Sequence, residues 1–431
     1  MTYKEAINYI TTSPKFGKIA GLQRIERLLE LLGNPQKQLK FVHVAGTNGK
    51  GSVCACIHSV LMDAGYKTGL FISPHLQRFS ERIRVDKTEV TEDEIIKYAE
   101  LVRQKADIMI HEGSESPTEF EIITAMSMLH FSAKACDIVV LEVGIGGIVD
   151  STNIISENES LLSVITSIGF DHMDYLGETL PEIASKKAGI IKNNHTTIVY
   201  PAKNSVMEVF ERTCTEKNAR LIKLDEHGIS IKSMRLNGTT FDIKGFDEIG
   251  DIEIKLLGKY GVYNAALAVL ACVELRGKGF DISDKNIKDG LVSARWPGRL
   301  EVVNNTPIVI IDGAHNPEGA NALLSELSAY FAGYKLTFIC GCMADKDATA
   351  LFAPFAPIAK RFITLTPDMS RAMPGDELME KIKVFHDKVE FKESVREALD
   401  YAISTSDPYD IICAVGSLYF MGGVRDYFGL E

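Results

Sequence analysis

The chain alternates between apolar runs and amphipathic stretches, and residues 41–65 are the clearest example. Phe41 to Val44 form a largely apolar run with β-branched residues, which predicts a buried strand. A glycine-rich turn follows. The apolar residues after that turn recur at helical spacing and precede a glycine placed to end the helix: Val53, Cys56, Ile57, Val60, Leu61, Ala64 and Gly65. Strand, glycine-rich turn and helix is the arrangement that a phosphate-binding loop requires.

The turn carries the residue types that bind phosphate: Gly46, Thr47, Asn48, Gly49, Lys50, Gly51 and Ser52. Glycines let backbone N–H groups approach an anion, and the helix N-terminus adds positive potential. Lys50 adds a point charge, and the hydroxyl of Ser52 can reach Mg²⁺. The spacing departs from the standard phosphate loop, because Val44 stands where the first glycine is expected and Gly51 separates Lys50 from Ser52. An ordinary glycine-rich turn is the alternative, and the strand–turn–helix setting favours the phosphate loop.

The same alternation continues along the chain and predicts an α/β fold. Apolar runs predict further strands at 68–72, 137–144, 163–168, 196–200, 307–312, 336–340, 361–366 and 410–415. Amphipathic stretches predict helices at 21–32, 92–106, 122–135, 180–188, 265–275 and 318–331. Between 229 and 257, short alternating stretches separated by turns predict a small antiparallel sheet. We therefore expect a mainly parallel sheet with a smaller antiparallel one beside it.

The segment 296–299, Trp-Pro-Gly-Arg, interrupts this alternation and is typical of a linker. Strands and helices restart after it. We therefore predict two α/β domains, 1–295 and 296–431. Two lobes joined in this way are expected to bind a substrate in the cleft between them.

Polar residues follow several predicted strands, at the carboxyl ends where parallel βα units place their ligands. Ser73 and His75 follow the strand after the phosphate loop, although Ser-Pro is also a plain turn. Glu142 ends the next strand. A carboxylate beside a phosphate loop is the usual Mg²⁺-organising acid, whereas alone it would be a solvated strand end. Asp171 and His172 follow the strand after that and resemble a metal or proton-transfer site.

Composition narrows the function classes. The 431 residues are 45% hydrophobic and 24% charged, as in a globular protein. The net charge of −11 argues against a general nucleic-acid surface. We find no signal peptide and no run long and apolar enough to cross a membrane, and therefore expect a cytoplasmic location. The eight cysteines are scattered, which predicts reduced and mostly buried thiols rather than a zinc site or disulfides.

Taken together, these residues resemble the folylpolyglutamate synthase/dihydrofolate synthase group of the Mur-type ATP-dependent ligases. The matching pieces run from Gly21-Leu22 to residues 416–420, which is essentially the whole chain. Their order and joint presence are highly specific. The pieces are residues 46–52, 73–76, 142–147, 171–172, 176–177, 187–190, 297–299 and 312–317. The Gly51 insertion that departs from the standard phosphate loop is itself this group's pattern.

The resemblance implies a role for each motif. It implies a P-loop Mur-ligase-like domain and a second, Rossmann-like α/β domain. The residues implied to contact ATP are Gly46, Thr47, Asn48, Gly49, Lys50, Gly51, Ser52, Asn264, Arg299 and Asp312. Ser73, Glu142 and His172 are the implied Mg²⁺ ligands. Those implied to hold the pterin end of the substrate are Thr118, Glu119, Phe120, Glu121 and Asp150.

Two further residues receive catalytic roles from the resemblance alone. By composition, Lys187 is a solvent-facing helical lysine beside Lys186. The resemblance instead implies that Lys187 is carbamylated and binds a second metal ion. It also implies that His315 lies near the γ-phosphate or the incoming glutamate. Lys50, His172, Lys187 and His315 are therefore the expected catalytic set.

The implied reaction joins L-glutamate to the terminal carboxylate of a reduced folate, at the expense of ATP and through an acyl phosphate. Dihydropteroate is a possible second acceptor, and a monomer is expected. Three alternatives stay open: a Mur-type ligase for another carboxylate, a P-loop kinase or NTPase, and a nucleotide-gated binding protein without turnover. Of these three, only a Mur-type ligase for another carboxylate would share the second lobe and its motifs with a folate ligase.

Overall fold

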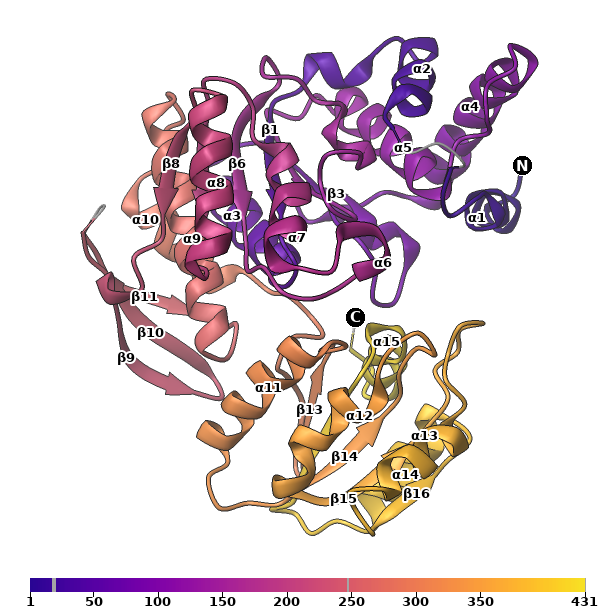
Figure 1. Cartoon of the computed structure of the whole chain (residues 1–431), viewed down its shortest axis with the longest axis vertical. Helices are drawn as coiled ribbons and strands as arrows, with labels where there is room; N and C mark the ends of the chain where they lie inside the picture. Colours follow the sequence, from indigo (N-terminus) through magenta and orange to yellow (C-terminus); the bar gives the residue numbers. More distant parts are fainter. Residues whose placement is uncertain (18–20, 246–247, 431) are drawn as a thin grey trace. The chain divides into compact units, whose positions relative to one another are not determined.

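The computed structural model describes residues 1–17, 21–245 and 248–430. Two compact units make up the chain (Figure 1). Unit 1 comprises Met1–Ser230, Phe241–Glu253 and Tyr263–Ala294, and unit 2 comprises Ile231–Thr240, Ile254–Val262 and Arg295–Glu431. Each unit is described by itself below.

An eight-stranded sheet forms the centre of unit 1, with the strand order β4-β3-β2-β5-β1-β6-β7-β8. Its strands are β1 (Phe41–Ala45), β2 (Thr68–Phe71), β3 (Ile83–Val85), β4 (Thr88–Glu89), β5 (Ile138–Glu142), β6 (Ser160–Ile165), β7 (Thr196–Val199) and β8 (Arg220–Lys223). The six strands from β2 to β8 in this order run parallel, and β3 and β4 are antiparallel additions at one edge.

This strand order brings distant segments to one edge of the sheet. β1 lies between β5 and β6, with Val44 opposite both Glu142 and Val164. Parallel strands end on the same side, so the segments after β1, β5 and β6 emerge together. The burial of both faces explains why these strands are apolar throughout.

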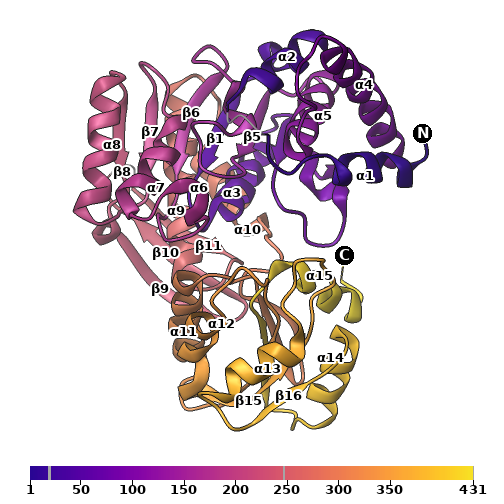
Figure 2. The same cartoon turned by 45° about the vertical axis from the view of Figure 1, so that its right-hand side comes forward.

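Helices cover both faces of this sheet (Figures 1 and 2). They are α1 (Tyr3–Thr12), α2 (Gln23–Leu31), α3 (Lys50–Asp63), α4 (Glu92–His111), α5 (Glu119–Ala133), α6 (Met173–Leu176), α7 (Leu180–Lys187), α8 (Asn204–Glu216), α10 (Asp284–Ser293), and α9 (Lys259–Gly277) from Tyr263 onward. The helices α1, α2, α4 and α5 share one apolar core with β1, β2, β3 and β5, and a second core holds α7 and α8 against β6 and β7.

A small antiparallel sheet follows α8, with the strand order β11-β10-β9. Its strands are β9 (Ile229–Arg235), β10 (Gly238–Ile243) and β11 (Ile249–Ile254). Buried and half-exposed residues alternate along β10, as expected for a sheet with one covered face.

Unit 2 contains a six-stranded sheet with the order β12-β13-β17-β14-β15-β16, in which only β12 is antiparallel. Its strands are β12 (Glu301–Asn305), β13 (Ile308–Asp312), β14 (Leu336–Cys340), β15 (Ala359–Thr364), β16 (Val389–Phe391) and β17 (Ile411–Val415). Its helices are α11 (Pro317–Tyr330), α12 (Ala348–Phe352), α13 (Gly375–Lys383), α14 (Val395–Ser404) and α15 (Leu418–Tyr427). The first three share the main apolar core with the sheet, and α14 packs against α15 (Figure 2).

The predicted α/β class, with a mainly parallel sheet and a small antiparallel one, is confirmed. All eight cysteines are buried and free, which agrees with the predicted buried thiols. Across the described ranges, no helix has the length and apolar character needed to cross a membrane. Several element boundaries differ from the prediction, and two helix starts differ by three residues or more. The helix expected from Ile122 begins at Glu119, and the one expected from Ala265 begins at Lys259.

Candidate active site

The glycine-rich turn connects β1 directly to α3, and Lys50 is the first residue of that helix. Gly46 and Gly49 have φ angles of 150° and 89°, and at Gly49 the left-handed backbone favours glycine. The ammonium of Lys50 donates to the carbonyls of Gly46 and Thr47, both at 3.2 Å. The positive charge of Lys50 therefore lies against the loop, at the N-terminus of α3. This is the arrangement that attracts phosphate.

Asn264 lies against this loop although it is distant in sequence. A Cβ atom on Gly49 would lie 2.5 Å from Asn264 Oδ1, so only glycine leaves room for the amide. Asn264 is also buried, at 6% exposure. The structure thus brings this predicted ATP contact to the phosphate loop, within unit 1.

The segment after β6 holds the other side of the loop. The backbone N–H of Thr47 donates to the Ser167 carbonyl at 2.7 Å. The Thr47 hydroxyl donates to the Gly169 carbonyl and accepts from the Gly169 N–H, at 3.1 and 3.0 Å. The loop is therefore fixed to the strand end that leads to His172.

Thr166 is a residue that the sequence interpretation did not single out. Its hydroxyl is buried, has no hydrogen-bond partner in the part of the chain that the structure describes, and lies so close to Gly46 that a Cβ there would be 1.7 Å away. An unpaired buried hydroxyl is unfavourable unless a ligand or water satisfies it. Neighbouring Ser167 donates its hydroxyl to the Asn48 carbonyl at 3.3 Å. The sequence offered little signal, because Thr166 lies inside the strand predicted at 163–168, whereas the structure ends that strand at Ile165.

The residues predicted to bind Mg²⁺ fall into two groups. The backbone N–H of Ser73 donates to Glu142 Oε2 at 3.0 Å, so these two residues are adjacent. His172 has a φ angle of 49°, and its Nε2 lies 3.9 Å from Asp171 Oδ2. Within residues 1–17, 21–245 and 248–430, no three His, Cys, Asp or Glu side chains are grouped so as to hold a metal ion.

Lys187, at the C-terminal end of α7, is one of the few buried lysines. Its side chain is 4% exposed, whereas Lys186 is exposed. The Lys187 ammonium donates to the Gly46 carbonyl at 2.7 Å, so Lys50 and Lys187 both bind the same carbonyl. The pKa of Lys187 is lowered to about 7, mainly by burial and also by the charge of Lys50, while Asp171 and Asp150 oppose the lowering. The expectation from composition that Lys187 faces solvent is therefore wrong, because its side chain is buried against the phosphate loop.

The segment predicted to hold the pterin starts α5 rather than forming a loop. Thr118 caps the helix: its hydroxyl accepts from the Glu121 N–H at 3.3 Å, and its own N–H donates to the Glu121 carboxylate at 2.7 Å. Arg24 also donates to that carboxylate, and Glu119 pairs with Lys15. These local bonds account for both glutamates without a ligand.

Phe120 and Asp150 line the turn after β5. A Cβ on Gly144 would lie 2.6 Å from the Phe120 ring, so this ring packs directly on the turn. The buried Asp150 carboxylate accepts from the Ile145 N–H at 2.9 Å and from the N–H and hydroxyl of Thr152 at 3.0 and 2.5 Å. Burial raises the pKa of Asp150, and these hydrogen bonds counteract the rise. The structure thus brings Asp150 next to Phe120 through one glycine-rich turn.

In unit 2, the predicted ATP residues gather around the end of β13. Asp312 is buried and accepts from the Leu300 N–H at 2.7 Å, the Ala314 N–H at 2.8 Å and the Tyr260 hydroxyl at 3.2 Å. Burial raises the pKa of Asp312, and the nearby Arg299 guanidinium lowers it. Arg299 covers Gly313, where a Cβ would lie 2.0 Å from Nη1.

His315 completes this group. Its Nδ1 lies 2.8 Å from the Gly313 carbonyl oxygen. That carbonyl can only accept, so Nδ1 carries a proton. Asn316 then caps α11 by accepting from the Gly319 N–H at 2.8 Å. Arg299, Asp312 and His315 are therefore neighbours within unit 2.

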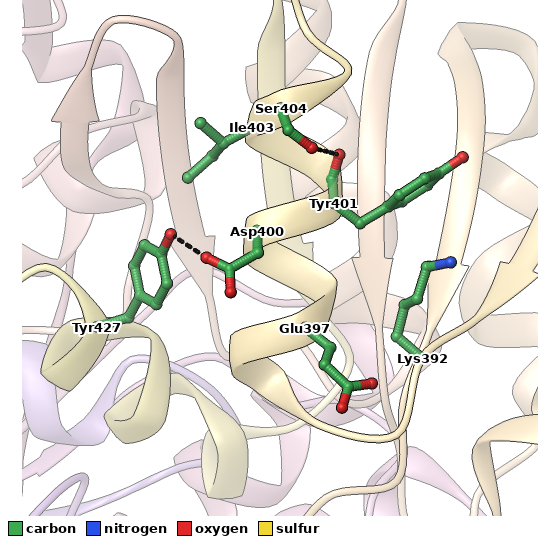
Figure 3. Close-up of a pocket in the computed structure, with 7 residues that line it drawn as sticks. All are labelled: Lys392, Glu397, Asp400, Tyr401, Ile403, Ser404 and Tyr427. Atoms are coloured by element: carbon green, nitrogen blue, oxygen red, sulfur yellow. Dashed lines mark hydrogen bonds between the residues drawn. The ribbon is translucent and has the colours of Figure 1, made fainter.

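A concave surface elsewhere in unit 2 has a volume of about 640 Å³ (Figure 3). Two pairs of its polar side chains contact each other: the Tyr427 hydroxyl donates to Asp400, and the Lys392 ammonium lies 3.8 Å from the centre of the Tyr401 ring. None of the predicted site residues lines it. We therefore place the candidate site at the strand ends and not in this hollow.

Comparison with known proteins agrees with this geometry. Residues 44–272 match the Mur ligase middle domain, and residues 298–418 match the Mur ligase glutamate ligase domain. A folylpolyglutamate synthase from Lacticaseibacillus casei is 35% identical, with 99% of this chain and 98% of the relative covered. A dihydrofolate synthase/folylpolyglutamate synthase from Bacillus subtilis is 34% identical, with 98% of each chain covered. The Mycobacterium tuberculosis folylpolyglutamate synthase, solved with ADP and AMPPCP, has a TM-score of 0.90 at 29% identity, covering 100% of this chain and 98% of that one. The chain therefore belongs to the folylpolyglutamate synthase/dihydrofolate synthase family of Mur ligases.

Proposed function

We propose that this chain is an ATP-dependent ligase that adds L-glutamate to the terminal carboxylate of reduced folates. The observation that carries the proposal is the convergence of Lys50 and Lys187 on the Gly46 carbonyl, under a glycine-rich loop at a helix N-terminus. The names of the full-length relatives support the substrate class, and the nucleotides in the mycobacterial structure support ATP. Dihydropteroate is the second acceptor to be tested.

The reaction requires two anions to approach each other. The substrate carboxylate must come near the triphosphate, and each charge pair at ~4 Å repels by about 4 kcal/mol in a partly screened site. Lys50 and the α3 N-terminus offset this repulsion and stabilise charge as the phosphoryl group moves. Transfer of the γ-phosphoryl group to the carboxylate gives an acyl phosphate and ADP. The α-amino group of glutamate then attacks the carbonyl carbon, and phosphate leaves.

The residues present fit Mg²⁺. The donors are oxygen atoms, from the carboxylate of Glu142 and the hydroxyls of Ser52 and Ser73, and Mg²⁺ usually takes one or two carboxylates together with phosphate oxygens. The unpaired Thr166 hydroxyl adds a further polar atom beside the loop. We propose that His172 completes this set. When bound, the ion would neutralise charge on the transferred phosphoryl group.

Lys187 is proposed to carry a carbamate and to hold a second metal ion. In carbamylation an uncharged amine adds to dissolved CO₂ and releases a proton, and a buried amine with a pKa of about 7 supplies the uncharged form near neutral pH. The product is an anion in place of a cation. It would therefore attract a metal ion that the unmodified lysine repels.

The remaining residues are proposed to bind ATP, glutamate and the pterin end of the folate. Asn264, Arg299 and Asp312 would contact ATP, and His315 would act near the γ-phosphate or the incoming glutamate. The segment 118–121 would hold the pterin end, with Asp150 acting through the turn that it organises. Monomeric action and cytoplasmic location are part of the same proposal.

The direct test supplies ATP, Mg²⁺ and glutamate with tetrahydrofolate or dihydropteroate, and identifies the products by mass spectrometry. We expect tetrahydrofolate to gain glutamyl residues. Extension of dihydropteroate would add the dihydrofolate synthase activity. If neither acceptor is extended, the proposal is wrong, and a Mur-type ligase for another carboxylate becomes the better explanation.

A further inference from the structure

A buried chain of three side chains, from His43 through Thr152 to Asp150, lies below the turn that follows β5, and the reaction described above gives His43 and Thr152 no role. His43 is fully buried in β1, and its Nε2 lies 2.8 Å from Thr152 Oγ1. That hydroxyl donates to Asp150 Oδ1 at 2.5 Å. Because a hydroxyl has a single proton, Thr152 gives it to Asp150 and must accept from His43. The hydrogen-bond network therefore assigns the proton of His43 to Nε2.

The other oxygen of Asp150 organises the turn above. Asp150 Oδ2 accepts from the Ile145 N–H at 2.9 Å. The Ile148 N–H then donates to the Lys186 carbonyl at 3.0 Å. A Cβ on Gly147 would lie 2.8 Å from the Lys186 carbonyl oxygen and 3.0 Å from that of Lys187. The turn thus packs directly on the end of α7.

These contacts close into a ring. Lys187 is bound by its ammonium to the Gly46 carbonyl at 2.7 Å, and Gly46 directly follows β1, the strand that carries His43. We infer that His43 and Thr152 are positioning residues that act through Asp150 to hold Lys187 against the Gly46 carbonyl. The inference rests on the proposed function, since that function is what gives Lys187 a role.

The physical reason is the cost of leaving buried polar groups unpaired. Replacing the Thr152 hydroxyl by a methyl group would leave the Nε2–H of His43 without its acceptor and would remove from Asp150 its shortest hydrogen bond, in a buried network. The turn can restore hydrogen bonds only by moving, and any movement loosens its contact with α7. Lys187 should then open to solvent more often.

The test measures how fast Lys187 reacts with an acylating reagent in the folded protein, read by mass spectrometry. In Thr152→Val we expect Lys187 to react about 5-fold faster or more, the factor that a modest local destabilisation produces. The exposed Lys186 should react at an unchanged rate and serves as the internal reference. Thr152→Ser keeps the hydroxyl and should restore the wild-type rate. Thr197→Val, in β7 of the same sheet and also fully buried, is the matched control and should leave Lys187 unchanged.

An unchanged Lys187 rate in folded Thr152→Val would overturn the inference. Should Thr152→Val not fold, His43→Phe and His43→Gln form a second pair, because glutamine keeps an N–H donor and phenylalanine does not. Acylation of Lys187 needs no folate, glutamate or ATP. Failure of the ligation assay would therefore overturn the proposed function alone. If the proposed function and this inference are both correct, Thr152→Val should lower kcat for ligation while leaving the KM for ATP near the wild-type value. Thr152→Ser should restore kcat.

Discussion

Lys186 and Lys187 are neighbours in the sequence but lie in opposite environments. Lys186 is exposed, whereas Lys187 is buried and bonded to the phosphate loop. Lys187→Ala should therefore nearly abolish ligation, and Lys186→Ala should be nearly normal. Acetate or formate added to Lys187→Ala should restore part of the rate, because either can occupy the vacated anionic position. The measurement is the ligation rate of both variants at fixed ionic strength. Equal and mild losses without rescue would remove the carbamate from the account.

Lys50 tests the phosphate loop itself. Lys50→Ala should lower the ligation rate by ~10²-fold or more, as expected when an electrostatic contact to the transition state is lost. The side chain bonds only to loop carbonyls in the described structure, so the thermal melt should match that of the wild type. Circular dichroism and the ligation rate check the two halves of this prediction. Normal activity would rule out the phosphate-loop assignment.

At the residue scale, the sequence supported a prediction where the signal was local. The loop from Gly46 to Ser52 and the strand-end Glu142 could be recognised because glycines, lysine and strand endings stand side by side in the sequence. Thr166 could not, because its importance depends on contact with Gly46 from another strand. Lys187 came only from the family resemblance, since its burial depends on how α7 meets the loop.

At the scale of an element, α3 carries a buried histidine, His58. Burial lowers the pKa of His58 from 6.5 to about 4. As the pH falls below 6.5, the unfolded chain therefore binds a proton that the folded chain does not yet accept. Stability should fall by up to about 1.4 kcal/mol per pH unit, or about 2 kcal/mol between pH 6.5 and 5. In His58→Asn, melting temperatures measured at these two pH values should differ less than in the wild type. If the melting temperature of His58→Asn fell as much between pH 6.5 and 5 as that of the wild type, His58 would not be the source of the acid sensitivity.

The turn after β5 is a second element with a sharp steric requirement. Gly147→Ala should lower ligation by about 10-fold or more, because its Cβ would lie 2.8 Å from the Lys186 carbonyl oxygen and push the turn off α7. Gly277→Ala is the control, since among the described residues no atom beyond the chain neighbours and its own helix backbone lies within 4 Å of the added Cβ. The test compares the ligation rates of the two variants, once their melting temperatures show that both are folded. Similar rates in the two would show that the turn tolerates displacement.

Element boundaries were harder to predict than element types. Residues 118–121 carry the Thr-x-x-Glu capping pattern, which placed the start of α5 three residues earlier than the apolar periodicity did. β12 was not predicted, because Glu301–Asn305 is largely polar and lies at the edge of its sheet. Edge strands have one free side and therefore need less apolar sequence than central ones.

At the scale of the whole molecule, periodicity predicted the α/β class but not the strand order. Nothing local to β1 shows that β5 and β6 flank it, yet this order brings the loop, Glu142 and the segment leading to His172 to one edge. Those long-range pairings are what convert scattered motifs into a candidate site. The domain boundary at residue 295 stays a prediction.

The central claim is that ATP is consumed to join a folate to glutamate, and ADP release measures this most directly. The wild type should release ADP rapidly only when folate, glutamate and Mg-ATP are all present, and slowly when either the folate or glutamate is omitted. Lys50→Ala should be slow under every condition. Fast ADP release without folate or without glutamate would contradict the account, because a kinase or a simple NTPase would then explain the site better.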